Sequence, residues 1–474
     1  MISFILNDKE VSTETGPGSS LLDFIRREAS LPGTKTGCRE GDCGACTVLE
    51  GKLKGGRVEY RSIVSCLSPL GNAHGKHIVT IEGINCKTLS PAQEAIVKNG
   101  GTQCGFCTPG FILSLTAFSL DSQSPEPERA IEAMSGNICR CTGYKSIERA
   151  AVSISRILKN RNPDNPAGWL VSQGFLPPYF ISIPERLAAI EAPTRTTGRR
   201  RTIIGGGTDI LVQKPDETSE SDTLLLFDDN DLKEIETKDG IIHIGASVTT
   251  SEIMHSSLMR ARIPRLYEYF RLISSEAVRN MGTIGGNICN ASPIADLVIF
   301  FMALNTSVSI KNLVSKQQRS LPLKALYKGY KKLDMLEDEI VTHLTFPAAQ
   351  GKLLFNFEKV SKRKMLDIAS VNSAMSAGIR NGLLEDVILS MGGVAPVPLY
   401  LEKTAGFLTG RSPGVETILE CNSVLQKEIS PISDIRGSKE YKRLLARQLL
   451  AAHFILLFPE HTDKDQLIKR LSEA

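Results

Sequence analysis

Apolar and polar residues alternate in short runs along the first part of the chain, the pattern typical of half-buried β-strands. Residues 2–6 alternate in this way, and a turn signal at residues 7–8 precedes a second run, which predicts a β-hairpin. A serine pair at 19–20 can cap an apolar helix that ends at Pro32-Gly33. Further short strands are expected at 47–49, 58–63 and 77–81. Strands around one helix, with a cysteine-containing loop beside it, predict a ferredoxin-like β-grasp domain of about 80 residues.

The periodicity becomes helical beyond residue 90. A capping box with proline at the first helical position begins at Ser90. Thr108 and Pro127 begin two more helices, and apolar residues spaced three and four apart through 147–158 mark a fourth. Four short helices predict a small bundle. The polar stretch 161–168, rich in proline, glycine and asparagine, predicts a linker after that bundle.

Strand and helix patterns are mixed in the remainder of the chain. An apolar run at 202–204 leads into three consecutive glycines, and strands are expected within 355–394. A terminal helix is predicted at 448–458. The chain is therefore predicted to be an α+β multidomain protein, since 474 residues are too many for one hydrophobic core.

Charge and cysteine content exclude several classes of partner and location. A net charge of +4 over 474 residues gives no reason to expect nucleic acid or an anionic membrane as partner. The amino-terminal residues have neither a basic segment nor a long apolar run, so a signal peptide is not expected, and no run reaches transmembrane length. Eight of the eleven cysteines lie in two tight groups, which favours metal ligation over disulfides. Such usage is typical of a reducing compartment, so a cytoplasmic location is expected.

The first cysteine group lies in a loop that also contains glycine. Cys38, Cys43 and Cys46 have C-x4-C-x2-C spacing, and Cys66 follows after nineteen residues. This is the spacing of a plant-type [2Fe–2S] site. Loop glycines permit positive φ angles and bring backbone N–H groups close to an anionic cluster. A structural zinc site is the alternative, although zinc sites usually pair their cysteines in two C-x2-C knuckles.

A second group of four cysteines lies in the predicted bundle. Cys104 and Cys107 precede its second helix, and Cys139 and Cys141 precede its fourth. Free N–H groups at helix amino-termini favour an anion, and a thiolate-ligated cluster is one. Zinc is again the alternative. Two different four-thiol groups in one half of the chain predict an electron relay, because a second cluster in series is hard to explain without electron transfer.

Two glycine-rich segments follow in the α/β part. Gly205–Asp209 comes directly after a predicted strand, where consecutive glycines can wrap backbone N–H groups around a phosphate. Alone it is equally compatible with an ordinary turn, because it lacks the G-x-G-x-x-G fingerprint. A second segment at 279–296 again combines glycine, asparagine, serine and aspartate. Two such loops could hold the two ends of a dinucleotide. The basic run at 357–367 is either a solvated strand end or, at Lys359, a cofactor contact.

These motifs together resemble the xanthine oxidase family. TGCREGDCGAC with Cys66, followed by QCGFC and NICRCTGY, is similar to that family's paired [2Fe–2S] domains. IIGGGTDI and GTIGGNICNASPIAD resemble its FAD domain. With the predicted elements, the resemblance gives a ferredoxin-like [2Fe–2S] domain at 1–84, a helical [2Fe–2S] domain at 85–160, a linker at 161–177, an FAD-binding domain at 178–348 and a C-terminal α+β flavoprotein domain at 349–474.

The family's roles are carried over to the matching positions of this sequence. The eight cysteines would ligate two clusters, with the cluster of the helical domain nearer to molybdenum. Residues 203–210 would embrace the FAD pyrophosphate, Lys359 would approach the flavin ring, and Ile273 stands where some members stack a phenylalanine on that ring. Tyr330 and the loop 363–367 would border a nicotinamide site. The full set of implied FAD contacts is Ile203, Ile204, Gly205, Gly206, Gly207, Thr208, Asp209, Ile210, Ile273, Thr283, Gly286, Asn287, Asp296 and Lys359.

The resemblance also implies a partner. No segment of the 474 residues resembles the family's molybdopterin domains, so a molybdopterin-binding large subunit is expected to hold the molybdenum cofactor and perform the hydroxylation. The assembly would be a heterodimer or a dimer of heterodimers. Electrons from a purine would cross two clusters to FAD and leave as hydride to NAD. The alternatives are the same relay serving an aldehyde or another heteroaromatic substrate, and a zinc-stapled scaffold without a redox role.

Overall fold

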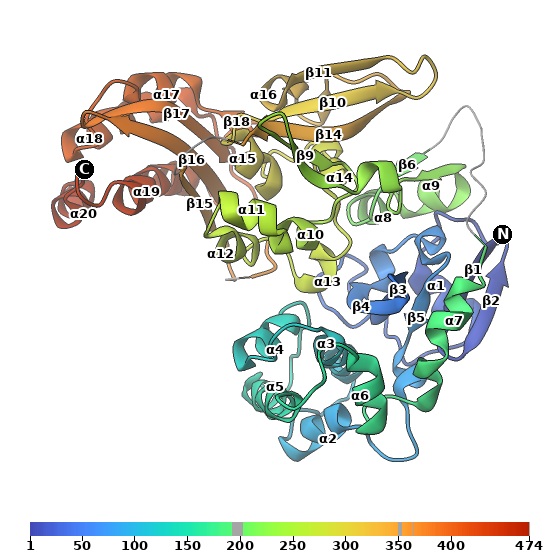
Figure 1. The fold of residues 1–474 in the computed structure, drawn as a ribbon. Coiled ribbons are helices and arrows are strands. Elements are labelled where there is room, and N and C mark those ends of the chain that lie inside the picture. Colours follow the sequence, from blue (N-terminus) through green and yellow to red (C-terminus); the bar gives the residue numbers. More distant parts are fainter. Residues whose placement is uncertain (192–201, 349–352, 364, 474) are drawn as a thin grey trace. The chain divides into compact units, whose positions relative to one another are not determined.

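The chain forms two compact units in a computed structural model that describes residues 1–191, 202–348, 353–363 and 365–473 (Figure 1). The first unit comprises Met1–Asp228 and Ser274–Gly282. The second comprises Asp229–Ile273 and Thr283–Ala474. Helices and strands are mixed in both units, which confirms the predicted α+β class.

A five-stranded sheet in the order β2-β1-β5-β3-β4 begins the first unit. The predicted hairpin is present, because β1 pairs antiparallel with β2, whereas β1 pairs parallel with β5. A short helix, α1, continues into one π-turn at Phe24–Glu28, so the helical segment ends before the predicted Pro32-Gly33. The elements are β1 (Ile2–Leu6), β2 (Lys9–Thr13), α1 (Leu21–Asp23), β3 (Thr47–Lys54), β4 (Arg57–Val64) and β5 (His77–Val79).

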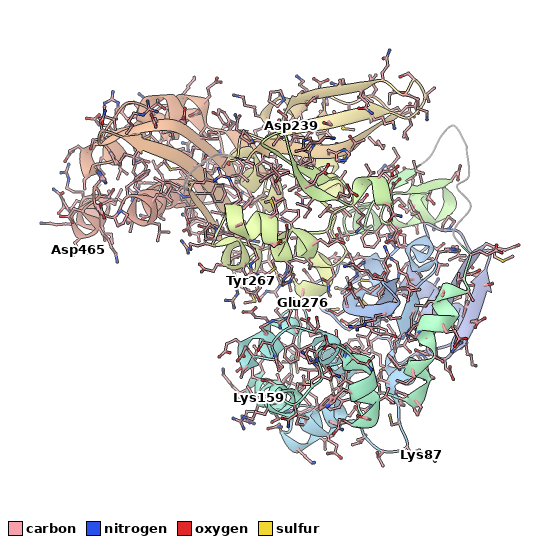
Figure 2. All side chains as sticks on the ribbon, viewed as in Figure 1. Lys87, Lys159, Asp239, Tyr267, Glu276 and Asp465 are labelled. Atoms are coloured by element: carbon pink, nitrogen blue, oxygen red, sulfur yellow. The ribbon has the colours of Figure 1, made fainter. Side chains whose placement is uncertain are left out.

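Four helices follow, as predicted from the apolar periodicity. At the start of the first, Ser90 Oγ accepts a hydrogen bond from Gln93 N, and Gln93 Oε1 accepts one from Ser90 N, which completes the capping box. The second helix is apolar on all sides and is therefore the central one. Lys87 lies on the exposed connection before these helices, and Lys159 follows the last of them (Figure 2). The helices are α2 (Pro91–Lys98), α3 (Thr108–Leu120), α4 (Pro127–Ala133) and α5 (Lys145–Leu158).

The segment predicted to be a linker contains a short helix. Helix α6 spans Pro166–Ser172, and its Leu170 is fully buried in the core of the helical bundle. Arg161 is also buried, and its guanidinium donates to the carbonyl oxygens of Ser119 and Gln123. Composition alone gave no sign of this helix, which forms because Arg161 and Leu170 both pack against the bundle. A 3-10 turn at Pro178–Ile181 and helix α7 (Ile183–Ala188) follow.

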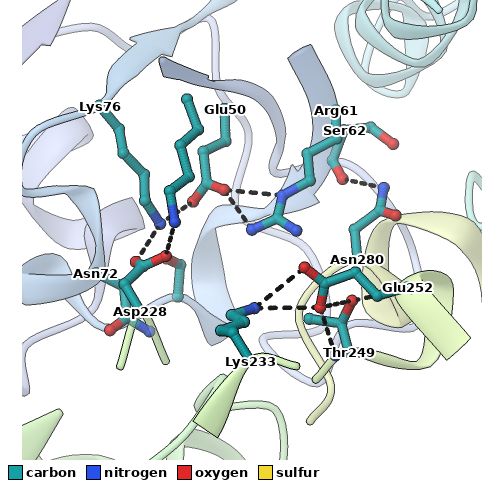
Figure 3. Close-up of polar contacts among 12 residues, drawn as sticks. Glu50, Arg61, Ser62, Asn72, Lys76, Asp228, Lys233, Thr249, Glu252 and Asn280 are labelled. Carbon is teal, nitrogen blue, oxygen red and sulfur yellow. Dashed lines mark hydrogen bonds and ion pairs between the residues drawn. The ribbon is translucent and has the colours of Figure 1, made fainter. Parts of the chain in front are cut away.

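The rest of the first unit packs on the ferredoxin-like sheet. Strands β6 and β7 pair in parallel and enclose helices α8 and α9 in sequence. Asp228, just after β7, joins a buried ion cluster in which Lys76 Nζ lies 2.8 Å from Asp228 Oδ2 and 3.1 Å from Glu50 Oε2 (Figure 3). The elements are β6 (Thr202–Ile204), α8 (Ile210–Gln213), α9 (Pro215–Glu220), β7 (Thr223–Leu225) and α13 (Glu276–Arg279).

A second five-stranded sheet, in the order β11-β10-β14-β9-β8, begins the second unit. Its core includes helix α15, in which every residue from Leu297 to Met302 is buried. The elements are β8 (Ile235–Lys238), β9 (Ile241–Gly245), α10 (Thr250–His255), α11 (Ser257–Arg262), α12 (Leu266–Phe270), α14 (Ile284–Cys289), α15 (Asp296–Met302), β10 (Ser307–Asn312), β11 (Gln318–Pro322), α16 (Leu323–Leu326), β12 (Tyr327–Gly329), β13 (Lys332–Leu333) and β14 (Glu339–Pro347).

An antiparallel sheet of four strands, β15-β16-β17-β18, forms the carboxy-terminal part with helices around it. The terminal helix predicted at 448–458 is longer, because α19 begins at Lys439, and a further helix, α20, follows it. The elements are β15 (Leu354–Val360), β16 (Val371–Arg380), β17 (Leu383–Gly392), β18 (Leu399–Tyr400), α17 (Glu402–Leu408), α18 (Val415–Glu428), α19 (Lys439–Leu457) and α20 (Lys464–Glu473). Among the described residues, no helix has both the length and the apolar character needed to cross a membrane.

Candidate functional site

The first four thiols lie together at one end of the ferredoxin-like sheet, in two contact pairs. Cys46 Sγ lies 3.3 Å from Cys66 Sγ, and both residues are buried. Cys43 Sγ accepts a hydrogen bond from Cys38 N at 3.4 Å, and the thiols of this pair are half-buried. Two loop glycines, Gly41 (φ 77°) and Gly44 (φ 66°), adopt the left-handed conformation that the loop requires.

Backbone and thiol contacts favour one ionised sulfur in each contact pair of this loop. The contact with Cys43 and N–H donors such as Glu40 N, 3.3 Å from Cys38 Sγ, lower the pKa of Cys38 to about 5. The Cys66 contact likewise lowers the pKa of Cys46, although burial opposes it. The same contacts raise the pKa of the partner thiols Cys43 and Cys66, so one thiolate is favoured in each pair. Thiolates are the form that ligates metal.

The other four thiols are paired in the same manner within the helical bundle. Cys141 Sγ lies 3.7 Å from Cys104 Sγ, and Cys107 contacts Cys139. Burial would raise the pKa of Cys139, but hydrogen bonds from Thr142 and from Cys141 N lower it overall. The strongest of these comes from Thr142 Oγ1, 3.1 Å from Cys139 Sγ. Cys104 and Cys141 are exposed, so this pair lies at the surface of the unit.

The donor set of both groups fits a two-iron cluster. A [2Fe–2S] cluster takes four thiolates, two on each iron, and each group supplies two contact pairs. A single zinc ion would require all four sulfurs around one point. The two contact pairs of each group are the arrangement that a [2Fe–2S] cluster takes.

A backbone hydrogen bond joins the loops that carry the two cysteine groups. Ile138 N donates to Cys43 O at 3.0 Å, and Cys139 is the next residue after Ile138. Asn137 Nδ2 reinforces the contact by donating to Gly44 O at 3.0 Å. Cys43 of the first group is thus hydrogen-bonded to the residue that precedes Cys139 of the second group.

The first glycine-rich segment, between β6 and α8, forms a close-packed loop of the first unit. Gly207 is left-handed (φ 85°), and a Cβ at Gly206 would lie 1.8 Å from Met281 O. No side chain larger than glycine fits at either position. Among the described residues, none accepts a hydrogen bond from the N–H groups of Gly206, Gly207 or Thr208. Three adjacent unpaired donors behind a glycine turn fit a phosphate group.

The remaining FAD candidates belong to the second unit, and three of them lie on or beside helix α14. Thr283 is buried, and its Oγ1 accepts from Gly286 N at 3.2 Å, which caps the helix. The Oδ1 atom of Asn287 is buried, and no hydrogen-bond partner for it is found among the described residues. An orphaned buried acceptor is uncommon in a folded protein and fits a ligand donor such as a hydroxyl.

Lys359 and Asp296 form a buried ion pair. Lys359 Nζ lies 2.7 Å from Asp296 Oδ2, and it also donates to Leu272 O at 2.8 Å. The side chains of Lys359 and Asp296 are only 2% and 12% exposed. The alternative of a solvated lysine at a strand end is therefore excluded. Ile273, which follows Leu272, is buried in the same core.

The candidates for a nicotinamide site are exposed or only partly described. Tyr330 is 64% exposed and follows strand β12. In the loop 363–367, Arg363 pairs with Asp367, and Lys364 lies outside the described residues. The assignment of these residues to a nicotinamide site stays a prediction.

Three polar residues with close contacts to the candidates escaped the sequence analysis. Thr142 donates to Cys139 Sγ, Asn372 donates to Asp296 Oδ1, and Asn72 donates to Gly205 O. Only Thr142 carried a local signal, because it lies three residues after a candidate ligand. Asn72 and Asn372 lie 133 and 76 residues from their partners, so no local pattern could identify them.

Known domain families match successive parts of the chain. Residues 4–70 match the 2Fe-2S iron-sulfur cluster binding domain, and residues 80–152 match a [2Fe-2S] binding domain. Residues 181–349 match the FAD binding domain in molybdopterin dehydrogenase. Residues 357–456 match the CO dehydrogenase flavoprotein C-terminal domain. The chain therefore has two [2Fe–2S] domains and an FAD-binding domain, and the zinc alternative is excluded.

Relatives extend this match over most of the chain. The xanthine dehydrogenase of Emericella nidulans is 28% identical over 480 residues, which cover 86% of this chain. These four matched domains and this relative together fit an iron–sulfur/FAD chain of the xanthine oxidase family. Other relatives in the family include the xanthine dehydrogenase/oxidase of Rattus norvegicus, 28% identical over 94% of this chain, and aldehyde oxidase 2 of Mus musculus, 27% identical over 97%.

The chain corresponds to only part of these relatives. It spans 35% of the length of the Emericella protein, 38% of the rat protein and 39% of the mouse protein. Among solved structures, the Cu,Mo-CO dehydrogenase in its cyanide-inactivated form matches 53% of this chain and 87% of its own, with a TM-score of 0.50 and 24% identity. That likeness supports the fold of the matched part.

Proposed function

We propose that this chain is the electron-transfer subunit of a molybdenum hydroxylase, most specifically of a xanthine dehydrogenase. Electrons would enter from a molybdenum centre on a molybdopterin-binding partner subunit, cross the two clusters to FAD, and leave to NAD. The hydrogen bond from Ile138 N to Cys43 O carries the proposal. Because it joins the two ligand loops, it supports two clusters in series over two independent structural clusters.

The residues of this chain supply binding, spacing and electrostatics. When bound, the clusters and FAD supply one-electron and two-electron redox chemistry. The eight proposed ligand thiols hold the iron, and the Asn137 and Ile138 contacts keep the two ligand loops at a fixed separation. The glycine loop would direct its N–H donors toward a phosphate. Backbone neighbours leave no room for a side chain at Gly206 or Gly207. The Lys359–Asp296 ion pair is buried, with its charged atoms 2.7 Å apart. We propose that this pair lies near the flavin ring.

The proposed substrate rests on similarity. Relatives named for xanthine and for aldehyde oxidation are 28% and 27% identical to this chain, so the test of substrate must include both classes. In the proposed arrangement the partner subunit binds the organic substrate, and this chain binds NAD and transfers electrons to it.

The test is a pair of activity measurements on the cofactor-loaded chain, alone and co-purified with its partner. Alone, the chain should pass electrons from NADH to an artificial dye and should not oxidise xanthine or hypoxanthine. With the partner, it should oxidise a purine with NAD as acceptor, whereas turnover of aldehydes alone would assign the other substrate class. Xanthine turnover by the lone chain would contradict the division of labour. A lack of NADH–dye activity in FAD-replete protein would contradict the NAD assignment.

A further inference from the structure

The segment that carries Cys66 touches the glycine loop directly, within the first unit. Gly207 faces the backbone just after Cys66, since a Cβ there would lie 2.6 Å from both Leu67 O and Pro69 Cδ. Beyond the loop, Leu211 is buried in the core that also contains Cys46 and Cys66. The segment that follows Cys66 therefore packs directly against the glycine loop.

A hydrogen bond from Asn72 stabilises the packing of the glycine loop against the Cys66 segment. Its side chain is part of the 3-10 turn Leu70–Ala73, six residues after Cys66, and the residue is only 5% exposed. Asn72 Nδ2 donates to Gly205 O at 3.2 Å. The bond fixes the carbonyl of the first glycine, and so sets the direction of the peptide units that follow it.

The turn that carries Asn72 is itself held on both sides. Gly71 packs so closely against β7 that a Cβ there would lie 2.3 Å from Leu225 Cδ1. Lys76 is tied to Glu50 and to Asp228 in the buried ion cluster (Figure 3), and its ammonium lies 4.8 Å from the centre of the Phe227 ring. Asn72 therefore donates from a well-packed support that connects the glycine loop to the Cys66 segment.

We propose that Asn72 is a positioning residue that couples FAD occupancy of the glycine loop to the integrity of the first iron–sulfur cluster. The inference rests on the proposed function, in which the FAD pyrophosphate occupies this loop. A phosphate on the N–H groups of Gly206 and Gly207 orders the loop, and through Asn72 it orders the segment that holds Cys66. Linkage is reciprocal, so an intact first cluster tightens FAD binding by the same factor.

The test compares the wild-type chain with Asn72→Asp, which keeps the shape and replaces the donor by an oxygen facing Gly205 O. In the wild type, bound FAD is expected to slow iron release from the first cluster to a chelator about tenfold, the effect of one well-placed buried hydrogen bond. In Asn72→Asp, FAD should bind about tenfold more weakly, and the FAD-dependent protection should vanish. The two clusters are followed separately by their electron paramagnetic resonance signals, and FAD binding by fluorescence quenching.

Two further variants make the result decisive. Asn72→Ala removes the donor without adding repulsion, and it should show an intermediate loss of protection even if Asn72→Asp folds poorly. Asn99→Asp changes another asparagine, whose Nδ2 donates to Ala95 O at 2.9 Å within the bundle, and it should keep full protection. Equal protection of the first cluster in the wild type and in Asn72→Ala would overturn the coupling while leaving the proposed function intact. A wild-type chain that binds no FAD would overturn both.

Discussion

Replacement of Lys359 by methionine is expected to lower the free energy of unfolding by about 3–5 kcal/mol, because removing one partner of a buried ion pair leaves the other charge uncompensated. Asp296 would keep its hydrogen bond from Asn372 but lose the ammonium that lies 2.7 Å from its carboxylate. The Leu272 carbonyl would lose its donor as well. Urea denaturation followed by circular dichroism measures the loss.

A double variant separates the structural role of the pair from its effect on flavin. Lys359→Met combined with Asp296→Asn removes both charges, and it should recover most of the lost stability. With Lys359 near the flavin ring as proposed, Lys359→Met should also lower the flavin reduction potential, because a positive charge favours the anionic reduced flavin. The double variant should not restore that potential. Lys362→Met, on an exposed lysine three residues along, is the matched control and should change neither quantity. Unchanged stability in Lys359→Met would contradict a buried, paired Lys359.

Replacement of Gly44 by alanine is expected to separate the two cluster loops. Gly44 has φ 66°, and a Cβ there would lie 2.4 Å from Gly136 O and 2.5 Å from Asn137 Nδ2. Left-handed backbone alone costs a non-glycine residue about 1–2 kcal/mol, and the contact with backbone of the other loop adds to it. Either the first cluster is lost, or electron exchange between the clusters slows by about tenfold or more. Iron content per chain and rapid-mixing kinetics distinguish these two forms of damage.

The matched control for this variant is Gly105→Ala in the second cysteine group. Gly105 is also left-handed, at φ 81°, but an added Cβ would meet no atom within 4 Å. It therefore carries the backbone strain without the close contact, and it should keep the iron of both clusters. Equal behaviour of Gly44→Ala and Gly105→Ala would show that the contact between the loops does not matter for electron exchange.

Local patterns were sufficient to predict the two cysteine groups and the elements beside them. Ligand spacing is fixed by the geometry of a short loop, so Cys38, Cys43 and Cys46 could be recognised without a structure. The capping box at Ser90 and the hairpin at 2–13 are equally local, since every contact lies within a few residues. The domain boundaries and the roles of the individual FAD contacts stay predictions.

Contacts between distant segments could not be predicted in the same way. The linker at 161–177 has the composition of a loop, but α6 folds there because Leu170 is buried against the bundle. The basic run around Lys359 has the composition of a solvated strand end, yet its partner Asp296 lies 63 residues earlier. In both cases tertiary packing overrides local composition, and composition was the only information available.

The most direct test of the relay is an anaerobic reductive titration of the purified chain with dithionite, followed by absorbance and electron paramagnetic resonance. The chain is predicted to take up about four electrons, one for each [2Fe–2S] cluster and two for FAD, and to show two distinct cluster signals. Iron and acid-labile sulfide should be present in equal amounts. Stoichiometric zinc without sulfide, or uptake of electrons by flavin alone, would contradict the account.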